Sequence, residues 1–222
     1  MSSADEGFTP LEGDERLTTA ILSDSCDAAG LRHQVLQDRL APVVPGSRAI
    51  GRARTVRFAP SLADDPEDPY GDAIDVIGSI GAGQLVVIAT AENNDSAFWG
   101  ELFSAAALGA GAVGVVTDGN LRDTARIAAL GLPAFSRSRR PIDFRARLRI
   151  VDVDEPVVLG GVTITAGDLV MADDDGVVVV PRAHEDEVLT LARERAARES
   201  TVLAELLAGE TLRAVWDRHR VL

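Results

Sequence analysis

The sequence predicts an α/β protein built on a mixed sheet. Three observations favour this class. A small-residue helical segment and a short apolar strand follow each other within residues 99–123, as in half of a βαβ unit. The apolar run 84–90 is typical of a strand buried on both faces. Residues 146–181 carry repeated turn signals between short β-type runs, which indicates a hairpin-rich second sheet.

The N-terminal half of the chain alternates helical and extended patterns. Apolar spacing predicts a helix over 14–30, and alternation predicts a strand within 46–59. The acidic, proline-broken segment 61–71 is expected to be a surface loop. A short helix over 72–80 and the buried strand 84–90 then lead into the central unit.

The C-terminal half begins with a predicted short helix over 124–130 and a strand, LPAFSR. Turn signals at Gly160-Gly161, Gly167-Asp168 and Asp175-Gly176 then divide the strand-rich region into hairpins. The three acids before Gly176 are interpreted as a turn, because consecutive strand residues point to opposite faces and would not share a metal. A long helix, 183–208, and a shorter one close the chain.

Composition narrows the class of protein. The 222 residues suffice for one core, so a single domain over 1–222 is expected. The net charge of −13 argues against nucleic-acid binding. Arginines clustered within 137–149 are interpreted as a solvated strand or subunit contact, with an anion or partner patch as the alternative. Without a bilayer-length apolar run or an N-terminal secretion signal, and with one cysteine, the expected location is the cytoplasm.

Lysine is missing from the whole sequence, because all 22 basic residues are arginine. Schiff-base chemistry, covalent pyridoxal phosphate attachment and a P-loop lysine are therefore impossible. If the protein makes or breaks carbon–carbon bonds, a metal ion must act as the electron sink in place of an iminium.

The segment 99–123 gathers the candidate chemistry. A helix from Glu101 to about Leu108 travels roughly 12–15 Å, and a strand over 112–117 returns roughly 20 Å. Glu101 and Arg122 should therefore lie near one sheet edge, beyond the strand carboxyl ends where α/β proteins usually bind ligands.

These residues suit a small anionic oxo-acid chelated to Mg²⁺. One carboxylate, Asp123, with waters and a chelating substrate is typical of Mg²⁺. Arg122 offers a permanently charged fork for a carboxylate or an enolate. Gly100 lets a ligand approach the free amides at the helix start, Gly100 to Phe103. The alternative remains open that Arg122-Asp123 is a structural salt bridge or a helix N-cap.

The central stretch WGELFSAAALGAGAVGVVTDGNLRD, followed by IAALGLPAFSR, resembles the family of ribonuclease activity regulator A and the 4-hydroxy-4-methyl-2-oxoglutarate aldolases. The resemblance extends to LSDSCDAAG, GRARTV and GGVTITAGDLVMADDDGVVVVP, and so covers nearly the whole chain. It implies a swivelling β/β/α-type fold with αββα layers, in homotrimers or hexamers. It also implies a Mg²⁺- or Mn²⁺-dependent aldolase acting on pyruvate-derived hydroxy-oxo-acids, often with oxaloacetate decarboxylation.

Residue roles also follow from the resemblance. It implies that Asp123 holds the metal and that Arg122 binds the substrate and stabilises the enolate. It also implies that the oxo-acid end is bound by the amides of Gly100, Glu101, Leu102 and Phe103. Glu101 is further implied to organise the base or water at the scissile alcohol. The chain departs from the family pattern at two positions. Glu101 replaces a frequent Asp, and Arg126 stands where the family commonly has an acid.

The leading functional hypothesis is a metal-dependent lyase that cleaves a 4-hydroxy-2-oxo acid or decarboxylates oxaloacetate to pyruvate. The two departures would favour decarboxylation, which needs no base. The alternative hypothesis is a non-catalytic regulator that binds and inhibits a ribonuclease, since an acidic protein could mask a basic partner.

Overall fold

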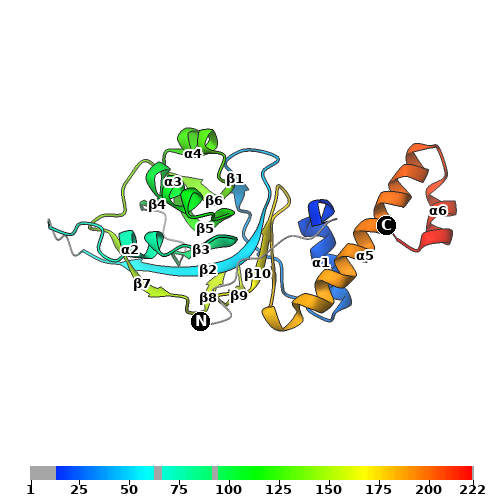
Figure 1. Ribbon diagram of the computed structural model, residues 1–222, viewed down its shortest axis with the longest axis horizontal. Helices are drawn as coiled ribbons and strands as arrows, with labels where there is room; N and C mark the ends of the chain where they lie inside the picture. Colours follow the sequence, from blue (N-terminus) through cyan, green and yellow to red (C-terminus); the bar gives the residue numbers. More distant parts are fainter. Residues whose placement is uncertain (1–13, 63–66, 92–94, 222) are drawn as a thin grey trace.

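The computed structural model describes residues 14–62, 67–91 and 95–221 (Figure 1). Its helices are α1 Thr19–Ala28, α2 Ala73–Gly78, α3 Glu101–Gly109, α4 Thr124–Leu130, α5 Glu185–Leu207 and α6 Leu212–His219. Its strands are β1 Ala41–Pro42, β2 Ala49–Pro60, β3 Gln84–Ala89, β4 Ala97–Trp99, β5 Gly114–Leu121, β6 Ala134–Arg139, β7 Leu148–Val153, β8 Val157–Leu159, β9 Val162–Ile164, β10 Leu169–Ala172 and β11 Val177–Val180. The predicted mixed α/β class is confirmed.

Nine strands form one curled sheet. Seven of them follow the order β1-β6-β5-β3-β2-β10-β11, and the other two are β4, which pairs with β5, and β7, which pairs with β2. Strands β2, β3, β5 and β6 run parallel in its centre. Strand β3 is buried along its whole length, as the apolar run predicts. The long strand β2 pairs antiparallel with β10 near its start and with β7 near its end, so it carries the sheet around a bend.

The hairpin-rich region is divided between two sheets. The hairpin β10–β11, closed by the predicted Asp175-Gly176 turn, extends the main sheet, and β7 also joins it. Only the hairpin β8–β9, closed by Gly160-Gly161, forms the small second sheet. The second sheet is therefore smaller than the number of turn signals suggests, because the other hairpin strands find partners on β2.

Strand β5 is longer than the sequence predicts. The expected strand ends at residue 117, but residues 118–121 continue it, and β4 pairs in parallel with Asn120 and Leu121. Asp118 is buried and accepts hydrogen bonds from the amide and hydroxyl of Thr90, at 2.8 and 2.7 Å. A Cβ at Gly119 would overlap the Phe98 ring, so the glycine serves close packing. Arg122 therefore lies directly after the carboxyl end of β5.

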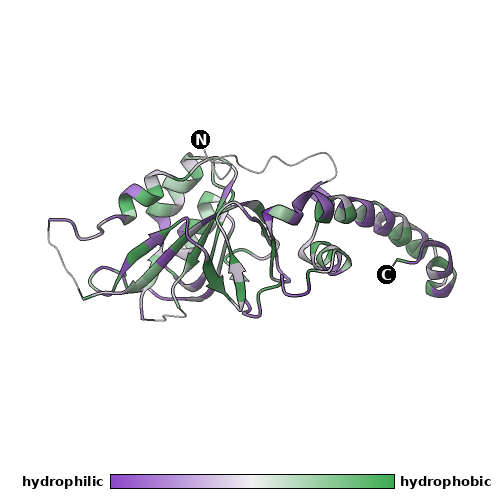
Figure 2. Cartoon of the chain, turned by 90° about the horizontal axis from the view of Figure 1, so that it is seen from below, coloured by the Kyte–Doolittle hydropathy of each residue, from purple (hydrophilic) through white to green (hydrophobic). Residues whose placement is uncertain are grey.

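The C-terminal helices α5 and α6 project away from the sheet, with α1 packed against α5 (Figure 1). In Figure 2 the strands are largely hydrophobic, whereas much of α5 is hydrophilic. Buried Arg52 on β2 and Glu185 at the start of α5 form an ion pair, with Arg52 Nη2 2.8 Å from Glu185 Oε1. This ion pair holds the first residue of α5 against strand β2 of the sheet.

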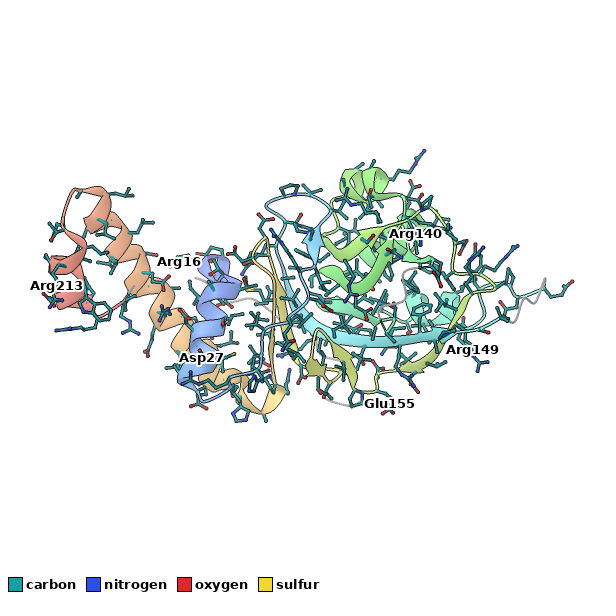
Figure 3. All side chains as sticks on the ribbon, turned by 180° about the vertical axis from the view of Figure 1, so that it is seen from behind. Arg16, Asp27, Arg140, Arg149, Glu155 and Arg213 are labelled. Carbon is teal, nitrogen blue, oxygen red and sulfur yellow. The ribbon has the colours of Figure 1, made fainter. Side chains whose placement is uncertain are left out.

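The fold shows the surroundings of two groups of charged residues, the three acids before Gly176 and the arginines within 137–149. Asp173, the first of the three acids before Gly176, accepts hydrogen bonds from the amide and hydroxyl of Thr19 at the start of α1. Two of the clustered arginines, Arg137 and Arg139, lie on β6 and one, Arg149, lies on β7, while the others lie on the segment between these strands. Strands β6 and β7 are not neighbours in the sheet, and Arg140 and Arg149 lie well apart in Figure 3. They therefore do not form one continuous basic stripe.

Two sequence predictions concern residues outside the described part. The N-terminal segment, expected to lack a secretion signal, falls largely on 1–13, and the acidic loop 61–71 includes 63–66. The limits 1–222 of the predicted single domain include these residues and stay a prediction. Across the described ranges, no helix combines the length and apolarity that crossing a membrane requires.

Candidate functional site

A pocket of about 380 Å³ opens where the parallel strands β4 and β5 end. Its volume is within the range of small-molecule sites. Every residue that the resemblance assigns to the metal or the substrate lines this pocket. The lining consists of Tyr70, Ile74, Ala97, Phe98, Trp99, Gly100, Glu101, Leu102, Phe103, Arg122, Asp123 and Phe144. The two ends of the central helix-and-strand unit therefore meet at one sheet edge, as the sequence predicts.

Helix α3 begins at the pocket wall with Gly100 as its N-cap residue. The amides of a first helical turn have no partner within the helix, so they can bind an anion. Here the Glu101 amide donates to Asp123 Oδ2 at 3.4 Å. Ser104 holds the two residues that precede the helix, Trp99 and Gly100. Its hydroxyl donates to the Gly100 carbonyl at 2.9 Å and accepts from Trp99 Nε1 at 2.7 Å.

Gly100 lies directly against the two charged residues that follow β5. A Cβ placed there would be 2.8 Å from Asp123 Oδ2 and 3.0 Å from Arg122 Cγ. The backbone of Gly100 is extended, with φ −152°, so its conformation does not require glycine. The requirement is for space, because the main chain at the start of α3 approaches both side chains closely.

Arg122 is oriented by contacts on both sides. Its amide donates to the Trp99 carbonyl at 2.9 Å, and its Nη1 lies 2.9 Å from Asp143 Oδ2. Burial disfavours the guanidinium charge, but the Asp143 carboxylate outweighs burial and raises the pKa of Arg122. The side chain is therefore a permanent cation held at the edge of the pocket.

Asp143 is in turn held by Tyr70, whose hydroxyl donates to Asp143 Oδ2 at 2.9 Å, and by the amide of Arg145 at 3.2 Å from Oδ1. Burial alone would raise the pKa of Asp143. The hydrogen bonds from Tyr70 and Arg145 and the charge of Arg122 outweigh it and lower the pKa below its ordinary value.

We expect the Asp143→Asn variant to be less stable than wild type by about 1 kcal/mol or less near neutral pH. Because the native pKa of Asp143 is lowered, its carboxylate stabilises the fold at every pH above the unfolded pKa of about 4. The difference should stay constant from about pH 7 to about pH 5 and vanish as the pH falls through the native pKa. Urea unfolding of both proteins measures it. A difference that grows on acidification would contradict this assignment.

Asp123 occupies the N-cap position of α4 in the left-handed conformation, with φ 54°. Its carbonyl accepts from the amides of Arg126 and Ile127, while its side chain makes no capping hydrogen bond. The ion pair with Arg122 is long, with 3.8 Å between Nε and Oδ2. The carboxylate therefore neither caps α4 nor forms a close salt bridge, although its Oδ2 accepts a long hydrogen bond, 3.4 Å, from the Glu101 amide at the start of α3. Left-handed non-glycine residues often lie at functional sites.

The residues present fit a hydrated Mg²⁺ rather than zinc. Within the described part of the chain, no three His, Cys, Asp or Glu side chains group as metal ligands, which a zinc site would require. Asp123 is 44% exposed at the pocket and its nearest amide, that of Glu101, is 3.4 Å from Oδ2. One accessible carboxylate is sufficient for Mg²⁺, which keeps several of its waters.

The Glu101 carboxylate lies beside the Arg126 guanidinium. Its Oε1 lies 3.5 Å from Nη1 of Arg126, whose side chain is 71% exposed. Arg126 therefore competes for the carboxylate that the resemblance assigns to the scissile alcohol. The two departures from the family pattern lie in contact with each other.

Sequence reasoning missed Asp143 and Tyr70, which hold Arg122. Asp143 is hidden among the arginines of 137–149, and Tyr70 follows an acidic loop. No local sequence pattern connects either residue with Arg122, so their contact could not be predicted. Tyr70 is, however, the only tyrosine in the chain.

Fold and pocket together define a mixed α/β protein with a pocket of small-molecule size at the carboxyl ends of parallel strands. A family profile described as RraA-like: Aldolase/RraA matches residues 19–179. The chain belongs to this RraA-like family, and the resemblance identified from the central stretch is confirmed. The family includes both aldolase and ribonuclease-regulator members.

Two relatives of known sequence carry different names. A protein of Halalkalibacterium halodurans, provisionally named as a 4-hydroxy-4-methyl-2-oxoglutarate aldolase, is 30% identical over 82% of this chain and 80% of its own length. Protein DlpA of Legionella pneumophila is 27% identical over 87% of this chain. The chain spans only 31% of the length of DlpA.

Solved structures share the fold. An uncharacterised protein of Pseudomonas syringae superposes with a TM-score of 0.81 at 31% identity, covering 94% of this chain and 99% of that one. Streptomyces coelicolor RraAS2, described as an unusual member of the RNase ES inhibitor RraA family, superposes with a TM-score of 0.74 at 26% identity. This second likeness covers 87% of this chain and 98% of RraAS2.

Proposed function

We propose that the protein is a divalent-metal-dependent lyase that releases pyruvate from a 4-hydroxy-2-oxo acid, from oxaloacetate, or from both. One observation carries the proposal. The pocket combines a fixed guanidinium, a carboxylate that neither caps α4 nor forms a close ion pair, and the first amides of α3 within one small volume. Such a group of charges suits the binding of a small oxo-acid and the stabilisation of an enolate.

Asp123 would hold Mg²⁺ or Mn²⁺, and the bound ion would supply positive charge at the carboxylate and 2-oxo oxygens of the substrate. The amides of Gly100, Glu101, Leu102 and Phe103 would bind the oxo-acid end. Arg122, held by Asp143, would pair with the negative charge that develops at the 2-oxo oxygen as the enolate forms. The protein thus supplies preorganised charge rather than a lysine imine, which the lack of lysine excludes.

In the retro-aldol reaction, the C3–C4 bond breaks and its electron pair moves to C3. The 4-hydroxyl loses its proton to Glu101, directly or through water, and C3 later accepts a proton to give pyruvate. Decarboxylation of oxaloacetate uses the same enolate, but it releases CO₂ and needs no base. Because Arg126 competes for Glu101 at 3.5 Å, decarboxylation is the less demanding reaction for this chain.

The direct test is pyruvate release from oxaloacetate and from 4-hydroxy-4-methyl-2-oxoglutarate, with Mg²⁺ and then with EDTA. We expect metal-dependent turnover of oxaloacetate above the rate with metal alone, and slower turnover of the hydroxy acid. Lack of metal-dependent turnover of both compounds would overturn the lyase assignment.

The second candidate function is inhibition of a ribonuclease by direct binding. Similarity to RraAS2 and the net charge of −13, which suits a basic partner, favour it. Inhibition of a ribonuclease that persists after metal removal, in a protein without lyase turnover, would support this candidate. A homotrimer or hexamer and a cytoplasmic location, both expected from the sequence, stay predictions.

A further inference from the structure

We propose that Arg139 and Arg140 bind the distal carboxylate of a dicarboxylate substrate, in a second pocket beside Asp123. This inference rests on the proposed lyase function and assigns the specificity for the distal end of the substrate. Neither arginine lines the pocket described above. Both line a smaller pocket of about 210 Å³. The proposal gives an anion-binding role to two of the arginines clustered within 137–149.

The first and second pockets adjoin at the candidate metal ligand. Arg122 and Asp123 line both of them. The first contains the start of α3, where the oxo-acid end would bind, and the second extends past Asp123 to Thr124 and the end of β6. The two carboxylate carbons of a five-carbon oxo-acid lie roughly 5 Å apart. A substrate bound at Asp123 would therefore extend from the first pocket into the second.

The ends of two neighbouring parallel strands form the second pocket. Leu121, the last residue of β5, and Arg139, the last residue of β6, are partners in the sheet. The Arg140 amide donates to the Leu121 carbonyl at 3.0 Å, which holds the backbone of Arg140 next to the end of β5. Ligands of α/β proteins bind beyond the carboxyl ends of strands, so both arginines lie at the edge where a substrate would bind.

Positive charge predominates in the second pocket. Its described lining contains three arginines and one carboxylate, that of Asp123, whose charge the bound ion would offset. Arg122 is already paired with Asp143 at 2.9 Å. Arg139 and Arg140 therefore supply the positive charge for a further anion. A carboxylate bound between them would accept charge-assisted hydrogen bonds, which are stronger than those between neutral groups.

Arg139 has only weak contacts in the protein, and its side chain can turn toward an anion. The residue is exposed, and its Nη2 lies 3.5 Å from the Val43 carbonyl, which is long for a hydrogen bond. Within residues 14–62, 67–91 and 95–221, no carboxylate pairs with it. Thr124 lines the same pocket and offers a hydroxyl donor. The pocket thus provides both charge and hydrogen-bond donors for a carboxylate.

A matched pair of unreactive oxo-acids tests the proposal by binding alone. 2-Oxoglutarate carries the distal carboxylate, and in 5-methyl-2-oxohexanoate an isopropyl group of similar shape replaces it. With Mg²⁺ present, calorimetric titration of wild type should give a dissociation constant about tenfold lower for 2-oxoglutarate. The Arg139→Ala/Arg140→Ala variant should bind the two compounds within about twofold of each other. Equal binding by wild type, or an undiminished preference in the double variant, would overturn the proposal.

Two further variants separate the local charge from other effects. Arg139→Lys/Arg140→Lys keeps both charges without the planar fork, and it should retain a preference of at least about threefold. Arg149→Ala removes an exposed arginine from β7, well apart from Arg140 in Figure 3, and should leave the preference unchanged. If Arg149→Ala loses as much preference as the double alanine variant, net charge rather than the second pocket is responsible, and the proposal is wrong.

The corresponding reactive pair is 4-hydroxy-2-oxoglutarate, which yields pyruvate and glyoxylate, and 4-hydroxy-5-methyl-2-oxohexanoate, which yields pyruvate and 2-methylpropanal. The double alanine variant should lower the ratio of kcat/KM for the first to that for the second by about tenfold. Metal-dependent exchange of the pyruvate methyl protons in D₂O by wild type reports the shared chemistry without any distal group. Absence of this exchange would overturn the lyase assignment and this proposal with it, whereas exchange together with an unchanged ratio would overturn this proposal alone.

Discussion

The Asp123→Asn variant is expected to lose metal-dependent pyruvate release by about 1000-fold, or about 4 kcal/mol of transition-state stabilisation. Asparagine keeps the size of the side chain and tolerates the left-handed backbone at φ 54°, so the fold should be retained. What the variant removes is the negative charge that would hold the ion. Alanine is a poorer choice here, because it would add backbone strain to the loss of the carboxylate.

Measurement requires two readouts. A lactate dehydrogenase-coupled assay on oxaloacetate, with the metal-only rate subtracted, gives the turnover, and titration with Mn²⁺ gives the affinity for the ion. Asp154→Asn is a matched control. Asp154 also has a left-handed backbone, with φ 60°, and pairs with Arg54, but it does not line the pocket. Wild-type turnover in Asp123→Asn would show that the metal assignment is wrong.

The Gly100→Ala variant is expected to lose about 100-fold in kcat/KM while its stability changes by about 1 kcal/mol or less. The added methyl group would lie 2.8 Å from Asp123 Oδ2 and 3.0 Å from Arg122 Cγ, so both charged side chains must move. Alanine readily adopts the extended backbone of this position. The loss should therefore come from displaced charge and blocked amides, not from unfolding.

A second glycine on the same helix provides the comparison. A Cβ at Gly109, the last residue of α3, would meet no atom within 4 Å. Gly109→Ala should therefore keep full activity and gain up to about 1 kcal/mol in the free energy of unfolding. Full activity in Gly100→Ala would mean that the substrate does not bind between α3 and the residues after β5.

Local patterns predicted the elements around the site well. Helix α4 begins and ends where the sequence predicts, and α3 extends only one residue beyond the expected Leu108. Strand β3 and the two hairpin turns also follow directly from apolar runs and glycine-containing pairs. These features depend on periodicity and turn chemistry within a few residues, which one sequence contains.

Contacts between distant segments were not predictable in this way. Nothing in the local pattern shows that β4 extends β5 past Thr117 or that Tyr70 and Asp143 meet at 2.9 Å. The contact of the Glu101 side chain with Arg126 depends on how α3 packs beside α4. Each of these outcomes depends on packing between segments that the chain brings together only when folded.

The sequence by itself determined the α/β class, the family resemblance and the exclusion of imine chemistry, because composition, periodicity and motif spacing are properties of the chain alone. It also predicted that Gly100 to Phe103 and Arg122-Asp123 meet at one sheet edge, since helix rise and strand rise fix that distance. Only the tertiary structure decided that Asp143 occupies the closest ion pair of Arg122 and that Tyr70 and Phe144 join the pocket lining. The physical reason is that ion pairs and pocket walls form between side chains far apart in sequence, where no periodic pattern connects them.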